Sequence, residues 1–399
     1  MKKMKIQKIS ALLFATFLMI VAFANEMFAQ NKINYNQLAG QQLNTQINTI
    51  TTAVPFLLIT PDSRAGGMGD VGVASTPDVN SIHWNPSKLA FVDKAMGIGV
   101  SYTPWLRALV PDINLAYLSG YYKTKKRGTI AASLRYFSLG EITFTDANGT
   151  TIGQFRPNEF AIDVAYGVKL GKHLSGGGAV RYINSNLTGG TFVDGSATKP
   201  GRAVAVDISM LYRKDKIKLA GGTKAISSIG LNISNIGNKI SYSNRGGTST
   251  SDFLPINMRL GYSIDFQFDE YNSLSIEVDA NKLLVPSPPV YKRDSLGGVV
   301  YSQGQPQILY GKDPNRGVTG GMLGSFNDAP GGGKEELREI NYGTGIEYWY
   351  NHLFAVRVGY FYESPYKGNR QFFTLGAGVK YNVFGLDFAY LIPTQQRNP

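Results

Sequence analysis

The chain has 399 residues, with 40 Lys and Arg against 28 Asp and Glu, a formal net charge of +12 and no cysteine. The lack of cysteine excludes a disulfide framework, a thiolate metal site and a cysteine nucleophile. The positive charge does not favour nucleic-acid binding, because no Lys/Arg cluster is interleaved with aromatic residues. No internal apolar run reaches 18 residues, which excludes a helical membrane protein.

Residues 1–29 have the pattern of a signal peptide. Four lysines stand within the first eight residues, before an apolar segment, residues 9–24, that is too short to span a bilayer comfortably. Ala22-Phe23-Ala24 offers a small-x-small cleavage site, and Ala29-Gln30 offers a second. A retained membrane anchor is the alternative. Residues 30–50, rich in Asn and Gln, are predicted to form a mobile mature N-terminus.

Residues 51–90 are predicted to be compact but not strand-like, because prolines and glycines interrupt any regular period. Within this segment, residues 67–72 have the form of a dinucleotide-binding fingerprint. That motif works only between a buried strand and a helix, whereas Pro61-Asp62-Ser63 precedes it here and Pro77 follows closely. We therefore interpret the glycines as places where backbone packs closely inside an enclosed interior.

From about residue 94 onward, bulky apolar residues alternate with small or polar ones. In residues 160–169, Phe160, Ile162 and Val164 share one face with Tyr166, while alanines, a glycine and single charges share the other. Residues 256–266 repeat the pattern, from Ile256 to Phe266. A period of two indicates β-strands with unlike environments on their faces. Because the apolar face is bulky and tyrosine-rich, the pattern favours a barrel with lipid outside and a polar interior.

Thirteen strand candidates follow, and bacterial single-chain barrels have an even number of strands. We therefore favour fourteen strands, with residues 299–309 as one candidate for the missing strand and a missing final strand as the other possibility. The candidates lie near residues 95–103, 112–122, 129–139, 159–170, 174–186, 203–213, 227–236, 255–267, 272–283, 340–350, 353–362, 371–381 and 383–392.

The connections alternate in length, as expected of periplasmic turns and outer loops. The short turns are predicted at residues 123–127, 170–173, 213–216, 269–271 and 350–352; the long loops are at 103–112, 141–157, 187–202, 238–254 and 284–339. The last loop is either functional or a surface loop without a role. The predicted fold class is an all-β transmembrane antiparallel β-barrel over residues 91–399, with residues 51–90 as a hatch inside its lumen. Export and such a barrel together predict the bacterial outer membrane.

Charges of both signs fall on the small-residue faces of the strands. These residues are Arg135, Asp163, Arg181, Asp207, Arg259, Asp265, Glu277, Asp279, Glu347, Arg357 and Asp387. Mixed signs suggest salt-bridge networks that hold a plug, although a solvated lumen wall remains open. The three histidines are too scattered for a metal site, and no G-x-S-x-G elbow occurs. We expect no enzyme activity, metal or cofactor.

Two motifs in the predicted hatch resemble the FadL-type barrels. The first is RAGGMGDVGVA (64–74), which contains Arg64, Gly66, Gly67, Gly69 and Asp70; the second is IHWNPSKLA (82–90), which contains Trp84, Asn85 and Pro86. In that family a glycine-rich stretch leads to an Asn-Pro step just before the first strand. LGAGVKY (375–381) with LDFAY (386–390) also looks like the family's late strands. The resemblance implies a hatch formed by these residues.

More narrowly, the whole chain resembles the PorV family, the FadL-like subunits of the type IX secretion system of Bacteroidetes. The resembling blocks are PFLLITPDSR (55–64), SYTPWL (101–106), GYFYE (359–363) and KGNRQ (367–371). The resemblance implies a barrel embedded in outer-membrane lipid that associates with the giant outer-membrane translocon subunit. It also implies binding of the C-terminal signal domain of secreted cargo, which is then delivered to the cell-surface sortase complex.

The first outer loop contains a candidate partner-binding cluster. Trp105, Leu106, Leu109 and Val110 are apolar and lie next to Arg107, and exposed aromatic and arginine side chains are typical of binding hot spots. Trp105 as an interfacial girdle residue is the alternative. The alternative function is a FadL-type transporter of hydrophobic small molecules, which predicts an apolar track from the outer loops to the hatch. A passive porin is disfavoured because the hatch should block the pore.

Overall fold

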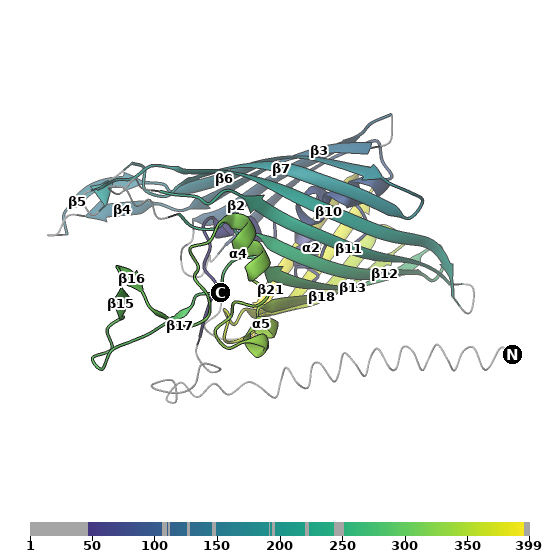
Figure 1. The fold of residues 1–399 in the computed structure, drawn as a ribbon. Helices are drawn as coiled ribbons and strands as arrows, with labels where there is room; N and C mark the ends of the chain where they lie inside the picture. Colours follow the sequence, from purple (N-terminus) through teal and green to yellow (C-terminus); the bar gives the residue numbers. More distant parts are fainter. Residues whose placement is uncertain are drawn as a thin grey trace.

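The computed structural model describes residues 47–105, 110, 112–125, 128–145, 149–190, 192–193, 196–219, 223–242 and 251–394. The predicted signal peptide and most of the predicted mobile N-terminus lie outside these residues. The described part is dominated by one antiparallel sheet of thirteen strands, in which each strand pairs with the next long strand along the chain. The sheet curves around an inner segment that precedes it in sequence (Figure 1).

The strands of this sheet coincide with the thirteen sequence candidates. They are β1 (Met96–Pro104), β2 (Ile113–Lys123), β3 (Gly128–Leu139), β6 (Asn158–Lys169), β7 (Leu174–Asn186), β10 (Gly201–Lys218), β11 (Lys224–Gly237), β12 (Asn257–Gln267), β13 (Asn272–Leu283), β18 (Ile340–Tyr350), β19 (Phe354–Tyr362), β20 (Gln371–Tyr381) and β21 (Phe384–Pro393). The antiparallel transmembrane β fold is thus confirmed.

The predicted fourteenth strand is not found in the described part of the chain. Residues 299–309 instead contribute to short pairings, β15 (Tyr301–Ser302) with β16 (Gln305–Pro306) and β14 (Val290–Tyr291) with β17 (Ile308–Tyr310). Two or three residues per strand cannot cross a bilayer, for which about 9–11 are needed. Among the described residues, β1 and β21 are the two edges of the sheet.

The two faces of the sheet have the predicted polarity. On β6, Ile162, Val164 and Tyr166 are about half exposed, whereas Ala161 and Asp163 are buried. The side that faces away from the lumen is therefore apolar. Ile256 departs from the prediction: it lies one residue before β12 and is fully buried with Leu284 and Val285, since the long outer loop covers it.

One short turn was predicted in the wrong place. Residues 213–216, predicted to be a turn, belong to β10, which continues as far as Lys218. Arg213 and Lys214 pair with β11, the next two residues form an irregularity, and pairing resumes at Ile217. The strand persists because its partner supplies backbone hydrogen bonds, which outweigh the weak strand preference of lysine and aspartate.

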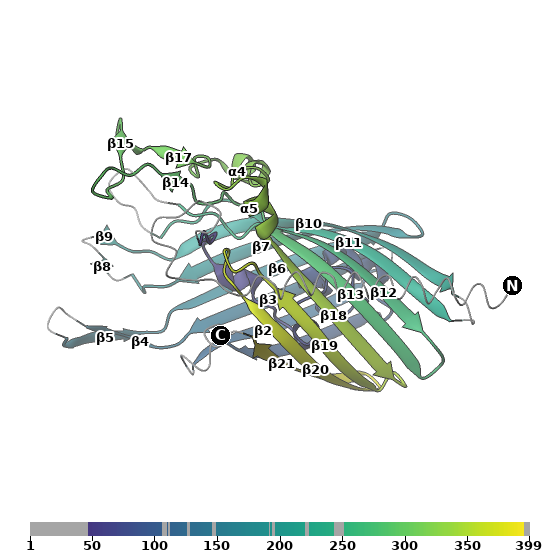
Figure 2. The ribbon, with the colours of Figure 1, turned by 90° about the horizontal axis from the view of Figure 1, so that it is seen from below.

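The outer loops carry small elements of their own. They are β4 (Ile142–Thr145), β5 (Thr151–Phe155), β8 (Phe192–Val193), β9 (Ser196–Ala197), α4 (Val318–Gly324) and α5 (Gly333–Arg338). Helices α4 and α5 belong to the long loop 284–339 and lie beside the outer end of the sheet (Figure 2). This loop therefore has an ordered structure.

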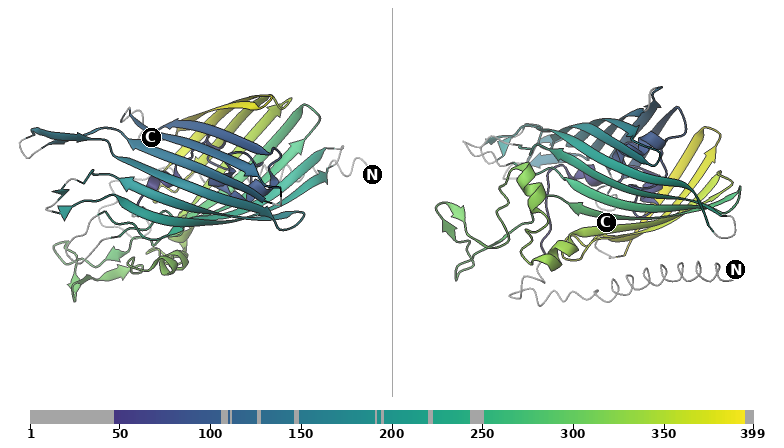
Figure 3. Two further views of the ribbon diagram at one scale, coloured as in Figure 1. Left: turned by 90° about the horizontal axis from the view of Figure 1, so that it is seen from above. Right: turned by 45° about the vertical axis from the view of Figure 1, so that its right-hand side comes forward.

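Residues 51–90, the predicted hatch, lie inside the curve of the sheet (Figures 1 and 3). Its elements are η3 (Pro55–Leu58), α2 (Ser63–Gly66), α3 (Ser81–Trp84) and η4 (Pro86–Phe91). Asp62 and Asn85 cap α2 and η4, and prolines begin η3 and η4. Among the described residues, no helix combines the length and apolar character needed to cross a membrane.

Candidate functional site

The hatch is in contact with every strand of the thirteen-stranded sheet. In strand order, the contacts are Gly99–Val79, Ser119–Asn80, Arg135–Leu57, Gly167–Pro86, Ser175–Ser87, Ser209–Ser87, Gly230–Val73, Ser263–Ala74, Asp279–Gly72, Glu347–Arg64, Gly359–Gly69, Gly376–Gly67 and Ala389–Gly66. A flat sheet could not reach one small segment from all of its strands. These contacts therefore require the sheet to wrap around the hatch.

Glycines on both sides make the closest of these approaches possible. Gly69 has a φ of +71°, and a Cβ added there would lie 2.6 Å from the carbonyl oxygens of Thr344 and Tyr360. On β19, a Cβ added to Gly359 would lie 2.2 Å from the backbone nitrogen of Gly69. Only glycine fits where two backbones approach this closely. The sequence interpretation of residues 67–72 as a close-packed backbone is thus supported by geometry.

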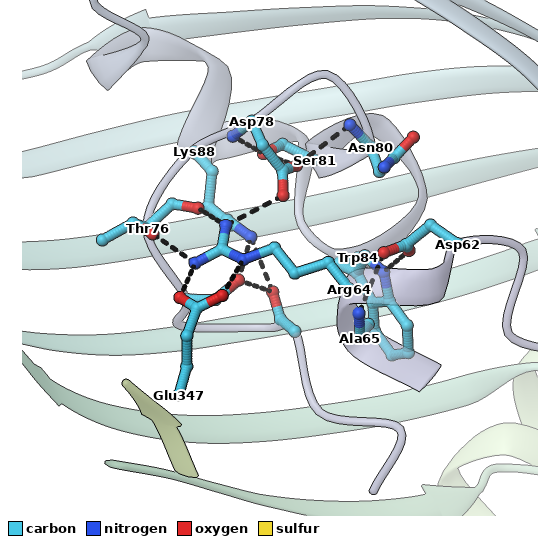
Figure 4. A network of polar contacts seen from close by, with 12 residues as sticks. Asp62, Arg64, Ala65, Thr76, Asp78, Asn80, Ser81, Trp84, Lys88 and Glu347 are labelled. Carbon is cyan, nitrogen blue, oxygen red and sulfur yellow. Dashed lines mark hydrogen bonds and ion pairs between the residues drawn. The ribbon is translucent and has the colours of Figure 1, made fainter. Parts of the chain in front are cut away.

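Arg64 is the main charged anchor of the hatch (Figure 4). Its Nη2 lies 2.7 Å from Oε1 of Glu347 on β18, and its Nε lies 3.1 Å from Oε2 of the same carboxylate. Its Nη1 lies 3.0 Å from a carboxylate oxygen of Asp78. A bidentate arginine–carboxylate pair fixes both distance and orientation. Arg64 therefore ties the hatch to the wall and also to its own loop.

Asp62 links the second family motif to the first. It accepts a hydrogen bond from the backbone nitrogen of Ala65 at 3.0 Å and one from Nε1 of Trp84 at 2.7 Å. Burial, together with the nearby Asp78, raises the pKa of the Asp62 carboxyl above its usual range. The indole of Trp84 also lies beneath the guanidinium of Arg259, 4.8 Å from its carbon. The two hatch motifs are thus joined through one carboxylate.

Asn85 and Pro86 form the Asn-Pro step and sit against the wall. The Asn85 side chain accepts from the backbone nitrogen of Ser87 at 3.0 Å and donates to the carbonyls of Val73 and Met210 at 3.0 and 3.1 Å. The carbonyl of Pro86 lies so close to Gly167 that a Cβ there would be 2.5 Å away. This step therefore locks one hatch turn to β6 and β10.

Two buried hatch residues were not singled out as site residues from sequence. Lys88 is fully buried and donates to the carbonyl of Gly72 at 2.8 Å and to Oγ of Ser75 at 2.6 Å. His83 is buried with Nδ1 2.6 Å from Nη2 of Arg135. Burial, reinforced by the Arg135 cation, lowers the pKa of His83 well below its usual range, so the ring accepts as a neutral imidazole. Their sequence signal is weak, since both lie in a short segment without periodicity.

The wall of the lumen carries ion pairs of both signs, as predicted. Arg181 on β7 is paired with Asp163 on β6 and Asp207 on β10. Arg357 on β19 is paired with Glu347 and Asp387, at 2.6 and 2.7 Å. The pairs are almost fully buried except for Asp387, which is partly exposed. These are internal salt-bridge networks, and Glu347 connects one of them directly to the hatch.

The lumen beside the anchor leaves almost no free space. The cavity lined by Arg64, Met68, Asp78 and Trp84 has a volume of about 10 Å³, no more than about one water. A larger cavity of about 130 Å³ lies at the outer end, between Asn48 and the long loop. Among the described residues, no group of three or more metal-ligating side chains occurs.

The predicted partner-binding cluster is only partly described. Leu106, Arg107 and Leu109 lie outside the described residues. Trp105 is half-buried, and its side chain packs against the apolar cluster that surrounds Phe56 and Phe137. Val110 is exposed. Trp105 thus lies at the border of the barrel interior, with part of its side chain packed inside.

The long outer loop is tied to the barrel by a buried clasp of charges. Glu339 accepts from Nζ of Lys282 at 2.6 Å, from Nζ of Lys367 at 2.9 Å and from Oγ of Ser287 at 2.6 Å. Lys367 also pairs with Glu335 on α5 at 2.5 Å. Because these groups are almost fully buried, the clasp holds the loop in one arrangement over the barrel end.

An apolar outer wall, a lumen lined by charges and a segment that closes this lumen define a plugged outer-membrane β-barrel. The chain belongs to the PorV family: the family model described as "Type IX secretion system protein PorV" matches residues 41–290.

Solved structures of FadL-type transporters are similar over most of the chain. The Pseudomonas putida toluene transporter TodX is 11% identical, with 85% of this chain and 91% of that chain covered and a TM-score of 0.42. The Ralstonia pickettii toluene transporter TbuX is 12% identical, with 84% and 93% covered and a TM-score of 0.41. A Pseudomonas aeruginosa FadL homologue is 12% identical, with 86% and 90% covered and a TM-score of 0.40. No curated protein matches the chain.

Proposed function

We propose that the chain is a non-enzymatic subunit of the type IX secretion system that is exported by an N-terminal signal peptide and inserted in the outer membrane. There it docks on the giant translocon subunit. It binds the C-terminal signal domain of secreted cargo and delivers this cargo to the cell-surface sortase complex. The family match supports the system, and the outer-wall polarity supports the membrane.

The contact of the hatch with all thirteen strands carries the docking part of the proposal. A folded protein cannot pass through a lumen in which the hatch contacts all thirteen strands of the sheet. The chain therefore works by binding on its outer surface rather than by conduction. The outer surface carries exposed apolar side chains that could bind a partner. Val110 is exposed, and so are Leu296, Leu323 and Leu337 of the long loop. Exposed apolar side chains of this size are typical of protein contacts.

The alternative, transport of hydrophobic small molecules, requires an apolar path to the hatch. In the described part of the lumen, Arg64, Glu347 and Arg357 occupy the centre, and the cavity beside them holds about 10 Å³. An apolar ligand there would strip these charges of partners, at a cost of several kcal/mol for each ion. The docking function is therefore favoured.

The test replaces three apolar residues of the predicted first outer loop and leaves Trp105, which packs on the interior, unchanged. A triple variant, Leu106→Asp, Leu109→Asp and Val110→Asp, is expected to lose co-purification with the translocon subunit and with cargo by at least tenfold. A matched triple on the long loop, Leu296→Asp, Leu309→Asp and Leu323→Asp, separates the two outer surfaces. Heat-modifiable gel mobility reports barrel folding in both. Unchanged co-purification of a folded first-loop variant would refute this assignment of the docking surface.

A further inference from the structure

The excess of positive charge gathers at the periplasmic end of the sheet. The turns after β2, β6 and β10, together with the strand ends that flank them, are rich in lysine, with Asp215 as the one carboxylate among their described residues. The exposed lysines are Lys123, Lys125, Lys169, Lys172, Lys214, Lys216, Lys218 and Lys224. By contrast, the next turn of this end, after β12, carries Asp269 and Glu270. Lysine is thus concentrated at one side of the rim, and the other side has the exposed Lys380 beside the turn after β20.

Three basic side chains at this rim contact the segment that leads from the hatch into β1. Nζ of Lys123 donates to the carbonyl of Val92 at 2.9 Å. Nζ of Lys169 and the guanidinium carbon of Arg213 lie 4.8 and 5.9 Å from the ring centre of Phe91, the last residue of η4. These contacts hold the exit of the hatch. The lysines nearer the tip of the hairpin of β10 and β11 have no ion pair among the described residues. They are therefore available to bind a partner.

The hairpin of β10 and β11 extends beyond β7 on one side, whereas β12 on the other side pairs with β11 as far as Lys224. Tyr212 is the last residue of β10 that pairs with β7, and the strand continues for six residues, to Lys218. At about 3.3 Å per residue and a tilt of about 40°, this is about 15 Å along the membrane normal. The hairpin lies at the end of the sheet opposite to α4 and α5 (Figure 1).

This length decides between lipid and protein as the partner. Tyr122, Tyr166, Tyr212 and Tyr262 are exposed on the outer wall near this end and mark the aromatic girdle. A headgroup layer is only about 5–8 Å thick. Lys216, Lys218 and Lys224, near the tip, therefore lie beyond the headgroups and face the periplasm.

The edge of the hairpin is also free. Past Arg213, whose backbone nitrogen donates to the carbonyl of His173, the β7 side of β10 has no backbone partner among the described residues. The strand is irregular there, because its register with β11 shifts between Lys214 and Ile217 and Lys216 has a φ of +59°. A free edge can accept an extended segment as an added strand. Lysines on an edge can also serve only to prevent such pairing, and the two roles differ in whether saturable binding occurs.

We infer that the periplasmic hairpin of β10 and β11 binds an acidic, extended segment of a periplasmic protein. The carboxylates pair with Lys216, Lys218 and Lys224, while the backbone of the segment adds to the free edge of β10. The inference concerns the end of the barrel opposite to the proposed docking surface. It stands or falls independently of cargo and translocon binding.

The test uses the full chain in phosphatidylcholine nanodiscs and a fluorescein-labelled peptide of eight glutamates, with eight glutamines as the reference peptide. Fluorescence anisotropy is expected to show saturable binding of the glutamate peptide at least tenfold tighter than of the reference. The triple variant Lys216→Glu, Lys218→Glu, Lys224→Glu should weaken this binding at least tenfold. The matched outer-face triple Lys292→Glu, Lys312→Glu, Lys334→Glu should change it less than twofold.

Three outcomes overturn the inference. Equal losses in the two triple variants would mean attraction by net charge alone. Absence of saturable binding to the native chain would mean that the lysines only protect the edge. If nanodiscs with 30% phosphatidylglycerol abolish peptide binding, lipid headgroups reach the hairpin tip and are its partner. Peptide affinity within threefold in both lipid mixtures supports the protein partner.

Discussion

Arg64 of the hatch and Glu347 of β18 form a bidentate ion pair across the lumen, with Nη2–Oε1 2.7 Å and Nε–Oε2 3.1 Å. The same carboxylate pairs with Arg357 on β19 at 2.6 Å. Glu347 thus binds the hatch and also links β18 to β19. Its two partners explain why a buried carboxylate is kept ionised in the lumen.

Removing Arg64 should loosen the hatch while the barrel stays assembled, because Arg357 still neutralises Glu347. We expect Arg64→Leu to lower the free energy of hatch docking by about 3 kcal/mol. Hydrogen exchange at residues 64–80 measures this as local protection. The control is Arg156→Leu, whose exposed pair with Glu141 is worth at most about 1 kcal/mol. Equal protection in the native chain and in Arg64→Leu would contradict the anchor role.

A methyl group on the wall should push the hatch out. In Gly359→Ala the new Cβ would lie 2.2 Å from the backbone nitrogen of Gly69, and neither backbone can give way. We expect the displaced hatch to block the lumen less completely. The variant should then show single-channel conductance in planar bilayers, where the native chain shows little. Gly385→Ala is the matched control, since its nearest neighbour would be 4.0 Å away. Identical conductance of the two variants would argue against close packing at Gly359.

Hatch stability should depend on pH through Asp70. Burial raises the pKa of this carboxyl to about 6 from an ordinary value of 3.8. Because the folded-state pKa is raised, the protonated form favours docking: the contribution is full below about pH 4 and is lost as the pH rises through about 6. The loss is up to roughly 3 kcal/mol. Hydrogen exchange of the hatch between pH 4 and pH 7.5 measures it.

Asp70→Asn is the matched variant for this pH dependence. Asp70 has a φ of +59°, a conformation that asparagine also tolerates. The variant should keep the hatch equally protected across the whole pH range. If its profile follows that of the native chain, another group is responsible.

Breaking the clasp at the outer end should free the long loop without harming the barrel. Lys367→Met leaves Glu335 and Glu339 buried with fewer partners, which costs about 3 kcal/mol. We expect at least tenfold faster limited proteolysis within residues 284–339. Lys334→Met, at an exposed neighbouring lysine, should leave the cleavage rate unchanged. Equal rates in both variants would show that the clasp does not order the loop.

Strand positions could be predicted from the sequence because the period of two is a local property. Each strand, such as β6 with Ile162 and Val164 outward and Asp163 inward, displays its two environments along its own length. The polarity of the lumen wall follows from the same alternation. The identity of the hatch also had a sequence signal, the glycines at 66–72 and the Asn-Pro step, as a resemblance to a family.

Tertiary structure alone decided how these pieces meet. The ends of β10 and the burial of Ile256 depend on neighbours far away in sequence, the β11 ladder and the long outer loop. The same holds for Lys88, whose Nζ only the folded hatch surrounds with the carbonyl of Gly72 and the hydroxyl of Ser75. Alternation along one strand determines which face of the sheet a side chain lies on. The groups that the side chain contacts on that face belong to segments up to hundreds of residues away, and such contacts leave no local pattern in the sequence.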